Sequence, residues 1–542
     1  MHHHWGEIDR RHLIKLGTVG LAALSLPGAA RAMMAQGFTH GVASGEPGSH
    51  SVLLWTRYAA ASDATLTAEV SESEDFSKVA AGGSVVAAGE RDHTAKLVVE
   101  GLEPGRWYHY RFIAPDGTRS VIGRTRTLPQ GSTKAFNLAL FSCSNMPFGW
   151  FNAYGHAAAR DDLDLMVHVG DYLYEYGPGK YPGKAMPGRS VLPANEMVTL
   201  ADYRLRHASY RADPDLRRLH QRFPMVAQWD DHELTNDAWA DGAQNHQPET
   251  EGDWTVRKAV AERVYREWMP VSERRYDSYQ IGSLATLFRP ETRITARSKQ
   301  LEFSDVLASH GDLDKAFAEF RDGPWSAPDR TLMGAEQEAW LHAGLVQSVK
   351  AGTRWQILAQ QVVMGSIRAP EAIADWAPAG VPAEARKTLM GIAAASKAGL
   401  PFNLDAWDGY PAARDRLLQA ALESESNLVV LSGDSHNAWG NNLTAHGRAV
   451  GVEYAGHAVT SPGFETFFPS VAPADVARNL RETNPGLIHS DTSRRGYVSL
   501  QLAPDRVYGE WHYVPTVAER TILGTTSDGL GVRWGERRFS AA

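Results

Sequence analysis

The chain has 542 residues with a formal net charge of -8, 43% hydrophobic residues and 22% charged residues. Because single domains usually contain about 100–200 residues, this length predicts two or three folding units, and the balanced composition excludes a largely disordered chain. The negative charge argues against general electrostatic attraction to nucleic acid, so no nucleic acid-binding surface is predicted.

The N-terminus has the pattern of an export signal. Arg10 and Arg11 precede a short apolar stretch over residues 16–26, and Ala30 and Ala32 are the small residues that a signal peptidase accepts. We therefore predict a twin-arginine signal peptide over residues 1–32, recognised by the twin-arginine export machinery, and a periplasmic or extracellular mature protein. The apolar stretch is too short to span a bilayer, so no stable membrane span is expected after cleavage. A cytoplasmic leader helix is the alternative interpretation.

The next segment is a series of short runs in which apolar and polar residues alternate. The runs lie at residues 51–56, 65–70, 96–100 and 107–113, and glycine- or proline-containing turns separate them. This pattern is typical of a small antiparallel β-sandwich, and we expect an N-terminal β-sandwich domain over residues 33–130.

Beyond this domain, apolar strand-like runs alternate with long helical or irregular segments, which predicts an α/β fold. The predicted strands are residues 136–141, 163–169, 224–228, 354–360, 428–431 and 452–459. The predicted helices are residues 199–207, 255–268, 334–348 and 412–422, the last preceded by Pro411, which suits a first helical turn. We expect a catalytic domain over residues 131–542. Within it, the Gly- and Pro-rich residues 176–200 are expected to form a surface loop near one end of the sheet.

Four of the predicted strands end directly in residues that can bind metals or transfer protons. These four clusters occupy residues 142–145, 170–175, 229–233 and 432–437. In open α/β sheets, ligands bind outside the carboxyl ends of the strands, so the four clusters are predicted to meet on one rim. Taken alone, each has a structural interpretation as a core cysteine, a turn or a helix cap, but their joint occurrence favours a shared site.

The charge of this rim indicates metal ions. Several carboxylates cannot all be ionised at one place unless a strong positive charge holds them together. Asp oxygens suit calcium, magnesium, manganese or ferric iron, whereas a thiolate and a phenolate favour a redox-capable or more acidic ion. A mixed-metal centre is therefore predicted. A ferric ion would lower the pKa of both Cys143 and Tyr174 enough for them to bind near neutral pH.

The order of the clusters resembles that of the calcineurin-like metallophosphoesterases, and a tyrosine three residues after Asp171 is similar to purple acid phosphatases. A closer resemblance is to the alkaline phosphatase D family. The motifs that carry it are Ser142-Cys-Ser144, His168-Val-Gly-Asp-Tyr-Leu-Tyr-Glu175, Trp229-Asp-Asp-His-Glu233 with Asn236-Asp237, Ser432-Gly-Asp-Ser-His436 and Thr460-Ser-Pro-Gly463. The resemblance runs from about residue 39 to residue 513.

The resemblance implies a small N-terminal β-sandwich followed by a two-sheet αββα catalytic domain. It also implies a secreted phosphoric ester hydrolase with Fe³⁺ and Ca²⁺, expected as one iron with one or two calcium ions. By motif position, Asp171 would bridge the metals, the iron site would be completed by Cys143, Tyr174 and His436, and calcium would be held by Asp231 and Asp434.

The resemblance leaves several neighbouring residues with less definite roles. Asn236 is predicted as a further metal ligand, although Asn236 and Asp230 alternatively only orient the neighbouring strand end. His232 is the candidate general acid or transition-state hydrogen-bond donor. His168 is expected to support a ligand or to be a core group, and the pair Arg494–Arg495 is expected to form structural ion pairs or to attract phosphate.

The predicted reaction is direct attack of a metal-bound hydroxide on a phosphate mono- or diester, with Asp171 and His232 as catalytic residues. No covalent intermediate is needed, and the sequence has no nucleophile-elbow motif beside a convincing triad. The expected partner is a small-molecule or polymeric phosphate ester. A phosphodiesterase or phospholipase D-like hydrolase is the alternative within this class. From another class, the alternative is a secreted binding protein that calcium only stabilises.

Overall fold

The computed structural model describes residues 35–308, 312–377, 380 and 383–540. The predicted signal peptide, residues 1–32, lies outside the described residues. Within the described part of the chain, no helix is both long and apolar enough to cross a membrane.

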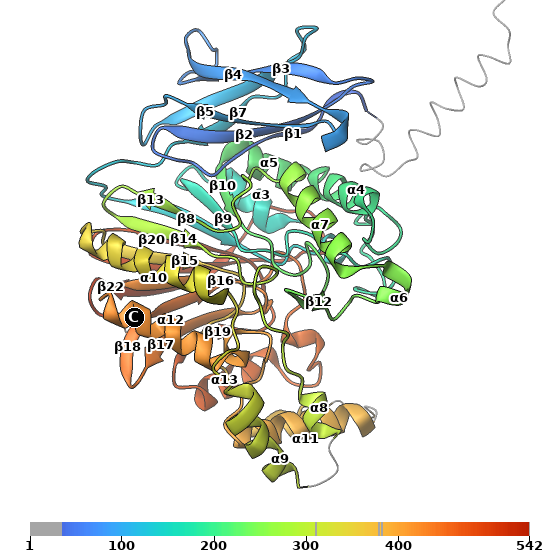
Figure 1. The fold of residues 1–542 in the computed structure, drawn as a ribbon, viewed down its shortest axis with the longest axis vertical. Helices are drawn as coiled ribbons and strands as arrows, with labels where there is room; N and C mark the ends of the chain where they lie inside the picture. Colours follow the sequence, from blue (N-terminus) through green and yellow to red (C-terminus); the bar gives the residue numbers. More distant parts are fainter. Residues whose placement is uncertain (1–34, 309–311, 378–379, 381–382, 541–542) are drawn as a thin grey trace, which may run out of the picture.

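Seven strands form the N-terminal β domain, at the top of Figure 1. They are β1 (Gly37–Gly45), β2 (Ser51–Ala59), β3 (Ala64–Ser71), β4 (Val79–Ala87), β5 (Thr94–Glu100), β6 (Trp107–Ile113) and β7 (Gly123–Arg126). One antiparallel sheet has the order β4-β3-β6-β7, while β1, β2 and β5 are neighbours in another sheet. Side chains from both sheets, including Val52, Leu66 and Phe112, share one apolar core. The prediction of an N-terminal β domain is confirmed.

This N-terminal domain is joined to the rest of the molecule by a continuous sheet. Strand β1 pairs in parallel with β10 (Pro224–Ala227), through Ser44 opposite Pro224 and Gly45 opposite Met225. A glycine is needed at this junction because a Cβ atom on Gly45 would lie 2.0 Å from the carbonyl oxygen of Pro270. The N-terminal strands therefore extend the sheet that carries three of the four predicted site clusters.

Two large sheets form the remainder of the fold. The first has nine strands in the order β22-β21-β20-β8-β9-β10-β1-β2-β5, and the second has seven in the order β13-β14-β15-β16-β18-β17-β19. The further strands of the first sheet are β8 (Phe136–Phe141), β9 (Leu165–His168), β20 (Arg495–Leu502), β21 (Arg506–Val514) and β22 (Thr526–Arg533). Those of the second are β13 (Asp277–Ile281), β14 (Ala285–Arg289), β15 (Trp355–Ala359), β16 (Leu428–Ser432), β17 (Ala438–Ala445), β18 (Arg448–Ala455) and β19 (Leu487–Asp491). A small hairpin joins β11 (Ala238–Trp239) and β12 (Gly242–Ala243).

The two large sheets pack against each other through buried apolar side chains. Leu140 and Val167 of the first sheet lie in the same core as Ile357 and Val429 of the second. The strands β8, β9 and β10 are parallel, as are β14, β15, β16 and β18. Since parallel strands are buried on both faces, the continuous apolar runs that predicted β8, β15 and β16 are explained by this position.

Helices cover the outer faces of both sheets (Figure 1). Side chains of α3 (Asn152–Ala159), α4 (Leu200–Arg211), α5 (Pro214–Arg222) and α7 (Trp254–Trp268) share a core with the first sheet. Those of α10 (Gly334–Lys350) and α12 (Pro411–Glu423) share one with the second. Helix α4 begins at a capping box in which Thr199 and Asp202 satisfy each other's backbone N–H groups. The predicted helices are confirmed to within a few residues. Of the loop expected at residues 176–200, residues 176–199 contain neither helix nor strand, and Leu200 begins α4.

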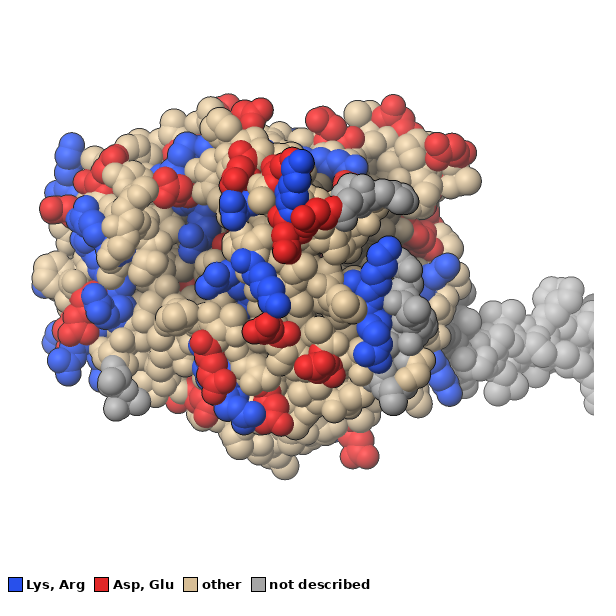
Figure 2. Space-filling model, turned by 90° about the horizontal axis from the view of Figure 1, so that it is seen from below, with Lys and Arg blue, Asp and Glu red and all other residues tan. Residues whose placement is uncertain are grey.

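A small helical lobe extends from the lower end of the molecule in Figure 1. It consists of α8 (Phe303–Leu307), α9 (Leu313–Phe320) and α11 (Ala383–Lys397), with a core that includes Val306, Phe317 and Ala395. Among the described residues, the remaining helices are α6 (Pro248–Glu251) and α13 (Pro473–Thr483), and the short helical turns are η1 (Gly89–Arg91), η2 (Met146–Phe148), η3 (Arg321–Trp325), η4 (Glu371–Asp375), η5 (Trp407–Gly409) and η6 (Phe464–Thr466). On the face shown in Figure 2, positive and negative side chains are interspersed.

His207 of α4 makes the stability of this fold sensitive to acid. Its ring is fully buried, is stacked on Trp268 with 6.4 Å between ring centroids, and has no hydrogen-bond partner among the described residues. Burial, followed by Arg211 and Arg206, lowers its pKa from 6.5 to about 3. Because the folded state binds a proton less readily than the unfolded chain, the stabilisation is complete above pH 6.5 and is lost as the pH falls toward 3.

Replacing His207 by phenylalanine is therefore expected to flatten the pH dependence of the free energy of unfolding. Between about pH 5.5 and pH 4, where this histidine is protonated in the unfolded chain but not in the folded state, the slope should decrease by about 1.4 kcal/mol per pH unit, measured by urea unfolding. The matched control is His342→Phe, because the side chain of His342 is 46% exposed. An unchanged slope in His207→Phe would contradict the assignment.

Candidate metal centre

The four predicted clusters follow strands of both sheets and meet where these strands end. Cys143 follows β8, Asp171 follows β9, and Asp230 and Asp231 follow β10, all in the first sheet. Asp434 follows β16 of the second sheet. The site is thus assembled across the interface between the sheets, at the carboxyl ends of parallel strands.

Glycines allow the backbones of these loops to approach closely. A Cβ atom on Gly170 would lie 2.3 Å from the Cβ of Asp230, and one on Gly433 would lie 2.5 Å from the Cβ of Ser142. The loops are also joined directly, since the N–H of Ser144 donates to the carbonyl of Asp171 at 2.8 Å. Larger residues at Gly170 or Gly433 would push the clusters apart.

Four of the predicted ligands have an unusual backbone conformation. Cys143, Asp171, Asp434 and His436 have φ angles of 58°, 55°, 63° and 61°, in the left-handed region that residues with a side chain rarely adopt. Such a conformation costs about 1–3 kcal/mol per residue and persists only where the surrounding structure enforces it, commonly at functional sites. The local strain therefore points to the same residues as the sequence motifs.

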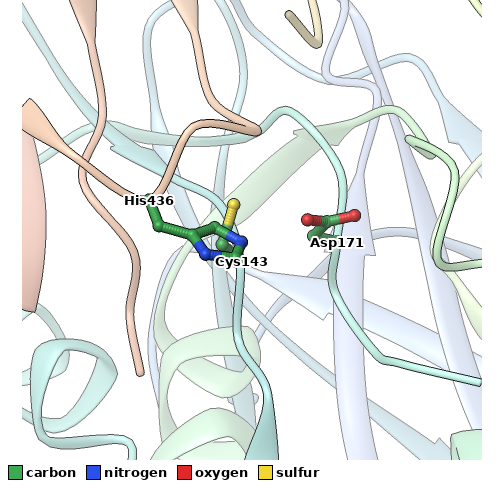
Figure 3. A group of neighbouring side chains, drawn as sticks. All are labelled: Cys143, Asp171 and His436. Carbon is green, nitrogen blue, oxygen red and sulfur yellow. The ribbon is translucent and has the colours of Figure 1, made fainter. Parts of the chain in front are cut away.

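One group of donor atoms contains the thiol, the imidazole and a carboxylate. The ligand atoms of Cys143, Asp171 and His436 lie within 4.8 Å of one another, and Figure 3 shows the three side chains side by side. The hydroxyl of Tyr174 joins them, donating to Asp171 Oδ2 at 2.9 Å and lying 3.2 Å from His436 Nε2. This mixture of sulfur, nitrogen and oxygen donors fits a ferric ion.

Neighbouring groups orient the side chains of this first cluster. His436 Nδ1 donates to the carbonyl of Pro462 at 2.9 Å, which leaves Nε2 as the ligand atom. Ser461 Oγ donates to the hydroxyl of Tyr174 at 2.8 Å. Burial lowers the pKa of His436 to about 3, so its imidazole is neutral and able to bind a metal.

Two further groups of possible ligands adjoin the first. Asp171, Asp231 and His232 form one, and Asp230, Asp231 and Asp434 form the other, each with ligand atoms within 4.8 Å of one another. Asp171 and Asp231 are therefore each shared by two groups. Neighbouring groups of carboxylates that share a residue can bind more than one cation of the kind that prefers oxygen ligands.

The buried carboxyl groups show the need for a cation. Oδ1 of Asp171 and Oδ2 of Asp230 are buried without a hydrogen-bond partner in the described part of the chain. Burial, and then neighbouring carboxylates, raise the pKa of Asp434 well above its ordinary value. Burial and Asp171 likewise raise the pKa values of Cys143 and Tyr174. Metal ions would remove this penalty, so the residues fit the predicted metals.

His232 is held in place by a buried glutamate. Its Nδ1 donates to Glu175 Oε2 at 2.7 Å, which leaves Nε2 free of this contact. Burial alone would lower the pKa of His232, but the carboxylates of Asp231, Glu175 and Asp171 raise it well above 6.5. A protonated imidazole beside the metal group can act as a general acid.

A second glutamate fixes the two loops of the first sheet. The Glu233 carboxylate accepts the backbone N–H groups of Asp171 at 3.0 Å, Tyr172 at 2.7 Å and Asp230 at 2.9 Å. Glu175 and Glu233 both lie inside the sequence motifs. The motifs do not show that Glu175 accepts a hydrogen bond from the ring of His232 or that Glu233 accepts hydrogen bonds from backbone N–H groups.

Sequence analysis missed two charged residues of the site. The buried guanidinium of Arg293 contacts Asp230, Asp405 and Asp434, and Asp405 also pairs with Arg297. Both Arg293 and Asp405 lie in irregular segments rather than at the end of a predicted strand. The single sequence contains no signal that would have connected them to the four clusters.

The remaining candidates lie beside the centre or are engaged elsewhere. The side-chain amide of Asn236 donates to Gln244 at 3.1 Å. His168 Nε2 lies 2.8 Å from the hydroxyl of Tyr154, and its Nδ1 accepts the N–H of Gly170. The two adjacent arginines are paired, Arg494 with Asp491 and Asp528, and Arg495 with Glu465.

Comparison with known proteins agrees with this geometry. Residues 138–511 match the family described as PhoD-like phosphatase, and residues 23–129 match the N-terminal domain of the PhoD-like phosphatases. The chain belongs to the PhoD-like phosphatases.

This PhoD-like phosphatase is 32% identical to alkaline phosphatase D of Bacillus subtilis (strain 168) over an alignment of 508 residues, and the match covers 89% of this chain and 78% of that protein. It is also similar to a solved structure of PhoD, with a TM-score of 0.74 and 28% identity, covering 93% of this chain and 92% of that chain. The predicted family, the α/β fold with an N-terminal β domain, and the class of phosphoric ester hydrolase are confirmed.

Proposed function

We propose that this phosphatase hydrolyses phosphate mono- or diesters at a centre of one Fe³⁺ with one or two Ca²⁺ ions. The observation that carries the proposal is the meeting of Cys143, Tyr174 and His436 with the carboxylate of Asp171. A structural calcium site needs neither a thiolate nor a phenolate. This donor set therefore disfavours the alternative of a binding protein that calcium only stabilises.

In this proposal, Cys143, Tyr174 and His436 hold iron, Asp231 and Asp434 hold calcium, and Asp171 bridges the two kinds of metal. The shared position of Asp171 in two ligand groups supports the bridging role. Asn236 would join the calcium ligands only if its amide left Gln244.

Bound metal ions would activate water and neutralise charge that develops on the phosphoryl oxygens. The protein's own contribution is to hold the reacting groups and to move a proton. Glu175 fixes His232 through Nδ1, so that Nε2 can donate a proton to the departing oxygen of the ester. Asp171 and Tyr174 are buried, so their oxygen atoms are shielded from bulk water.

Substrate choice is proposed to depend on the loop at residues 176–200. Tyr176 of this loop has its ring centroid 5.5 Å from that of His232, and the ring centroid of Tyr181 is 6.1 Å from that of Tyr174. We propose that these rings contact the organic part of the ester. Comparing turnover of nitrophenyl phosphate and bis(nitrophenyl) phosphate, together with choline release from a phospholipid, distinguishes phosphatase, phosphodiesterase and phospholipase D-like activity.

The finer architecture and the export route belong to the same proposal. Helices on the outer faces of two packed sheets support an αββα catalytic domain over residues 131–542, with a β-sandwich over residues 33–130. The arginine pair at the N-terminus supports export by the twin-arginine machinery to the periplasm or the extracellular space.

The proposed metal content predicts a coloured protein that chelation inactivates. Untagged exported protein is expected to contain iron and calcium by elemental analysis and to show a visible charge-transfer band from ferric phenolate or thiolate ligation. Prolonged chelation should remove the metals and the activity together, and restoring both metals should return the activity. Colourless, iron-free protein with full activity would contradict the iron site. Colourless, iron-free protein without activity would favour the alternative of a binding protein that calcium only stabilises.

A further inference from the structure

Arg293 lies inside the acidic part of the centre and has no exposed surface. Its Nε donates to Asp230 Oδ1, its Nη1 lies 2.8 Å from Asp405 Oδ2, and its Nη2 lies 3.3 Å from Asp434 Oδ1. Nη2 is also 4.0 Å from Asp231 Oδ1. One guanidinium therefore lies within 4.0 Å of a carboxylate oxygen of Asp230, Asp231 and Asp434, the group that contains the proposed calcium ligands.

The backbone around Arg293 is anchored by another buried carboxylate. Glu291 accepts the N–H groups of Arg293 at 2.7 Å, Ile294 at 2.9 Å and Thr295 at 2.8 Å. It also accepts the indole N–H of Trp229, the residue that precedes Asp230, at 3.0 Å. The guanidinium is thus fixed relative to the cluster that it contacts and is not a mobile surface charge.

The contacts of Arg293 join three separate parts of the chain. Asp230 follows a strand of the first sheet, Asp434 follows a strand of the second, and Asp405 belongs to the irregular segment before η5. A guanidinium keeps its charge at any ordinary pH, and its planar fork can bond several carboxylates at once. Unlike a bound metal, it cannot be removed by a chelator.

We propose that Arg293 is a built-in cation of the metal centre, a positioning residue that occupies the place of an additional divalent ion between Asp230, Asp405 and Asp434. The inference rests on the proposed function, because it concerns the same metal centre. It assigns one oxygen each of Asp230 and Asp434 to the guanidinium, which shares the carboxylate of Asp405 with Arg297. Oδ2 of Asp230, which has no hydrogen-bond partner in the described residues, stays available for the neighbouring calcium position.

The test is the number of calcium ions bound per chain. Wild type, Arg293→Met and the charge-balanced double variant Arg293→Met/Asp405→Asn are dialysed against calcium, and bound metals are counted by elemental analysis. Arg293→Met is expected to bind one calcium ion more than wild type, because Asp230 and Asp434 lose their cation and Asp405 keeps only Arg297. The double variant should return to the wild-type count. Arg495→Met is the matched control, since Arg495 pairs with Glu465 instead, and its count should equal that of wild type.

A second measurement follows the thermal midpoint of unfolding as calcium is added. Calcium should raise the midpoint of Arg293→Met more than that of wild type or of the double variant, because ligands that bind only the folded state stabilise it. Arg293→Lys, which retains the charge, should keep the wild-type count.

The outcomes separate this inference from the proposed function. Folded Arg293→Met with an unchanged calcium count would overturn the role of Arg293 while wild type still carried its metals. If Arg293→Met fails to fold, the double variant decides. A soluble double variant with the wild-type number of calcium ions supports the proposal, and failure of both variants to fold overturns it. Wild type without bound iron or calcium would instead contradict the proposed function.

Discussion

Replacing Asp171 by asparagine is expected to reduce kcat/KM on the order of 10³-fold or more, because one carboxylate serves two parts of the centre. Its ligand atoms belong both to the group with Cys143 and His436 and to the group with Asp231 and His232. An amide has the same shape but cannot bridge two cations with a negative charge. The variant is therefore expected to lose metal as well as turnover.

The Asp171→Asn experiment combines elemental analysis with steady-state kinetics on a nitrophenyl ester. The matched control is Asp408→Asn, since Asp408 is also buried but accepts the N–H of Ile367 at 2.9 Å, away from the strand-end clusters. This control should keep its metals and its activity. Full iron and calcium together with near wild-type turnover in Asp171→Asn would rule out the bridging role.

Replacing His232 by asparagine is expected to lower kcat by about 10²–10⁴-fold on esters with a poor leaving group. The effect should be much smaller on a nitrophenyl ester, because nitrophenolate departs without being protonated. Metal content should stay near that of wild type, since His232 is assigned to proton donation. Equal losses on alkyl and nitrophenyl esters would contradict the general-acid role.

Glu175→Gln is the companion variant for the same prediction. Glutamine keeps a hydrogen-bond acceptor for His232 Nδ1 but removes a negative charge that helps to raise the pKa of His232. The imidazole must be protonated to act as an acid, so activity falls as the pH rises through this pKa. In Glu175→Gln the pKa is lower, and the alkaline fall of kcat/KM should move to lower pH. A pH profile identical to that of wild type would refute the coupling of the two residues.

The residues that sequence reasoning brought together are those whose motifs directly follow apolar strands. Cys143, Asp171, Asp231 and Asp434 were predictable because each follows a run of buried residues, and the carboxyl ends of parallel strands share one edge. The same patterns predicted β8, β9, β10, β15 and β16 to within a few residues.

Arg293 and Asp405 were not predictable for the opposite reason. Each lies in an irregular segment, where neither a period of alternating burial nor a strand end indicates its position. The contacts of Arg293 with Asp230, Asp405 and Asp434 depend on long-range packing of the two sheets. The roles of Glu175 and Glu233 were not predictable for another reason. A motif shows that an acidic residue is present, but it does not show which hydrogen-bond donors that residue accepts.

The pairing between β1 and β10 was also beyond sequence reasoning. Two residue pairs join these strands, and they come from segments about 180 residues apart in the chain. An alternating pattern predicts that a strand exists, but it does not specify a distant parallel neighbour. The boundary expected near residue 130 separates two sequence patterns, while the hydrogen bonds of the first sheet cross it.

Because β1 pairs with β10, the N-terminal domain covers what would otherwise be an exposed edge strand of the catalytic sheet. Without β1, the outer side of β10 would expose unpaired N–H and C=O groups, which commonly recruit a strand from another molecule. Because β10 leads directly into Asp230 and Asp231, disorder at that edge would reach the metal ligands within a few residues. A shortened enzyme that begins near residue 131 would thus be liable to aggregation and to loss of its calcium ligands, even though every predicted ligand remained in its sequence.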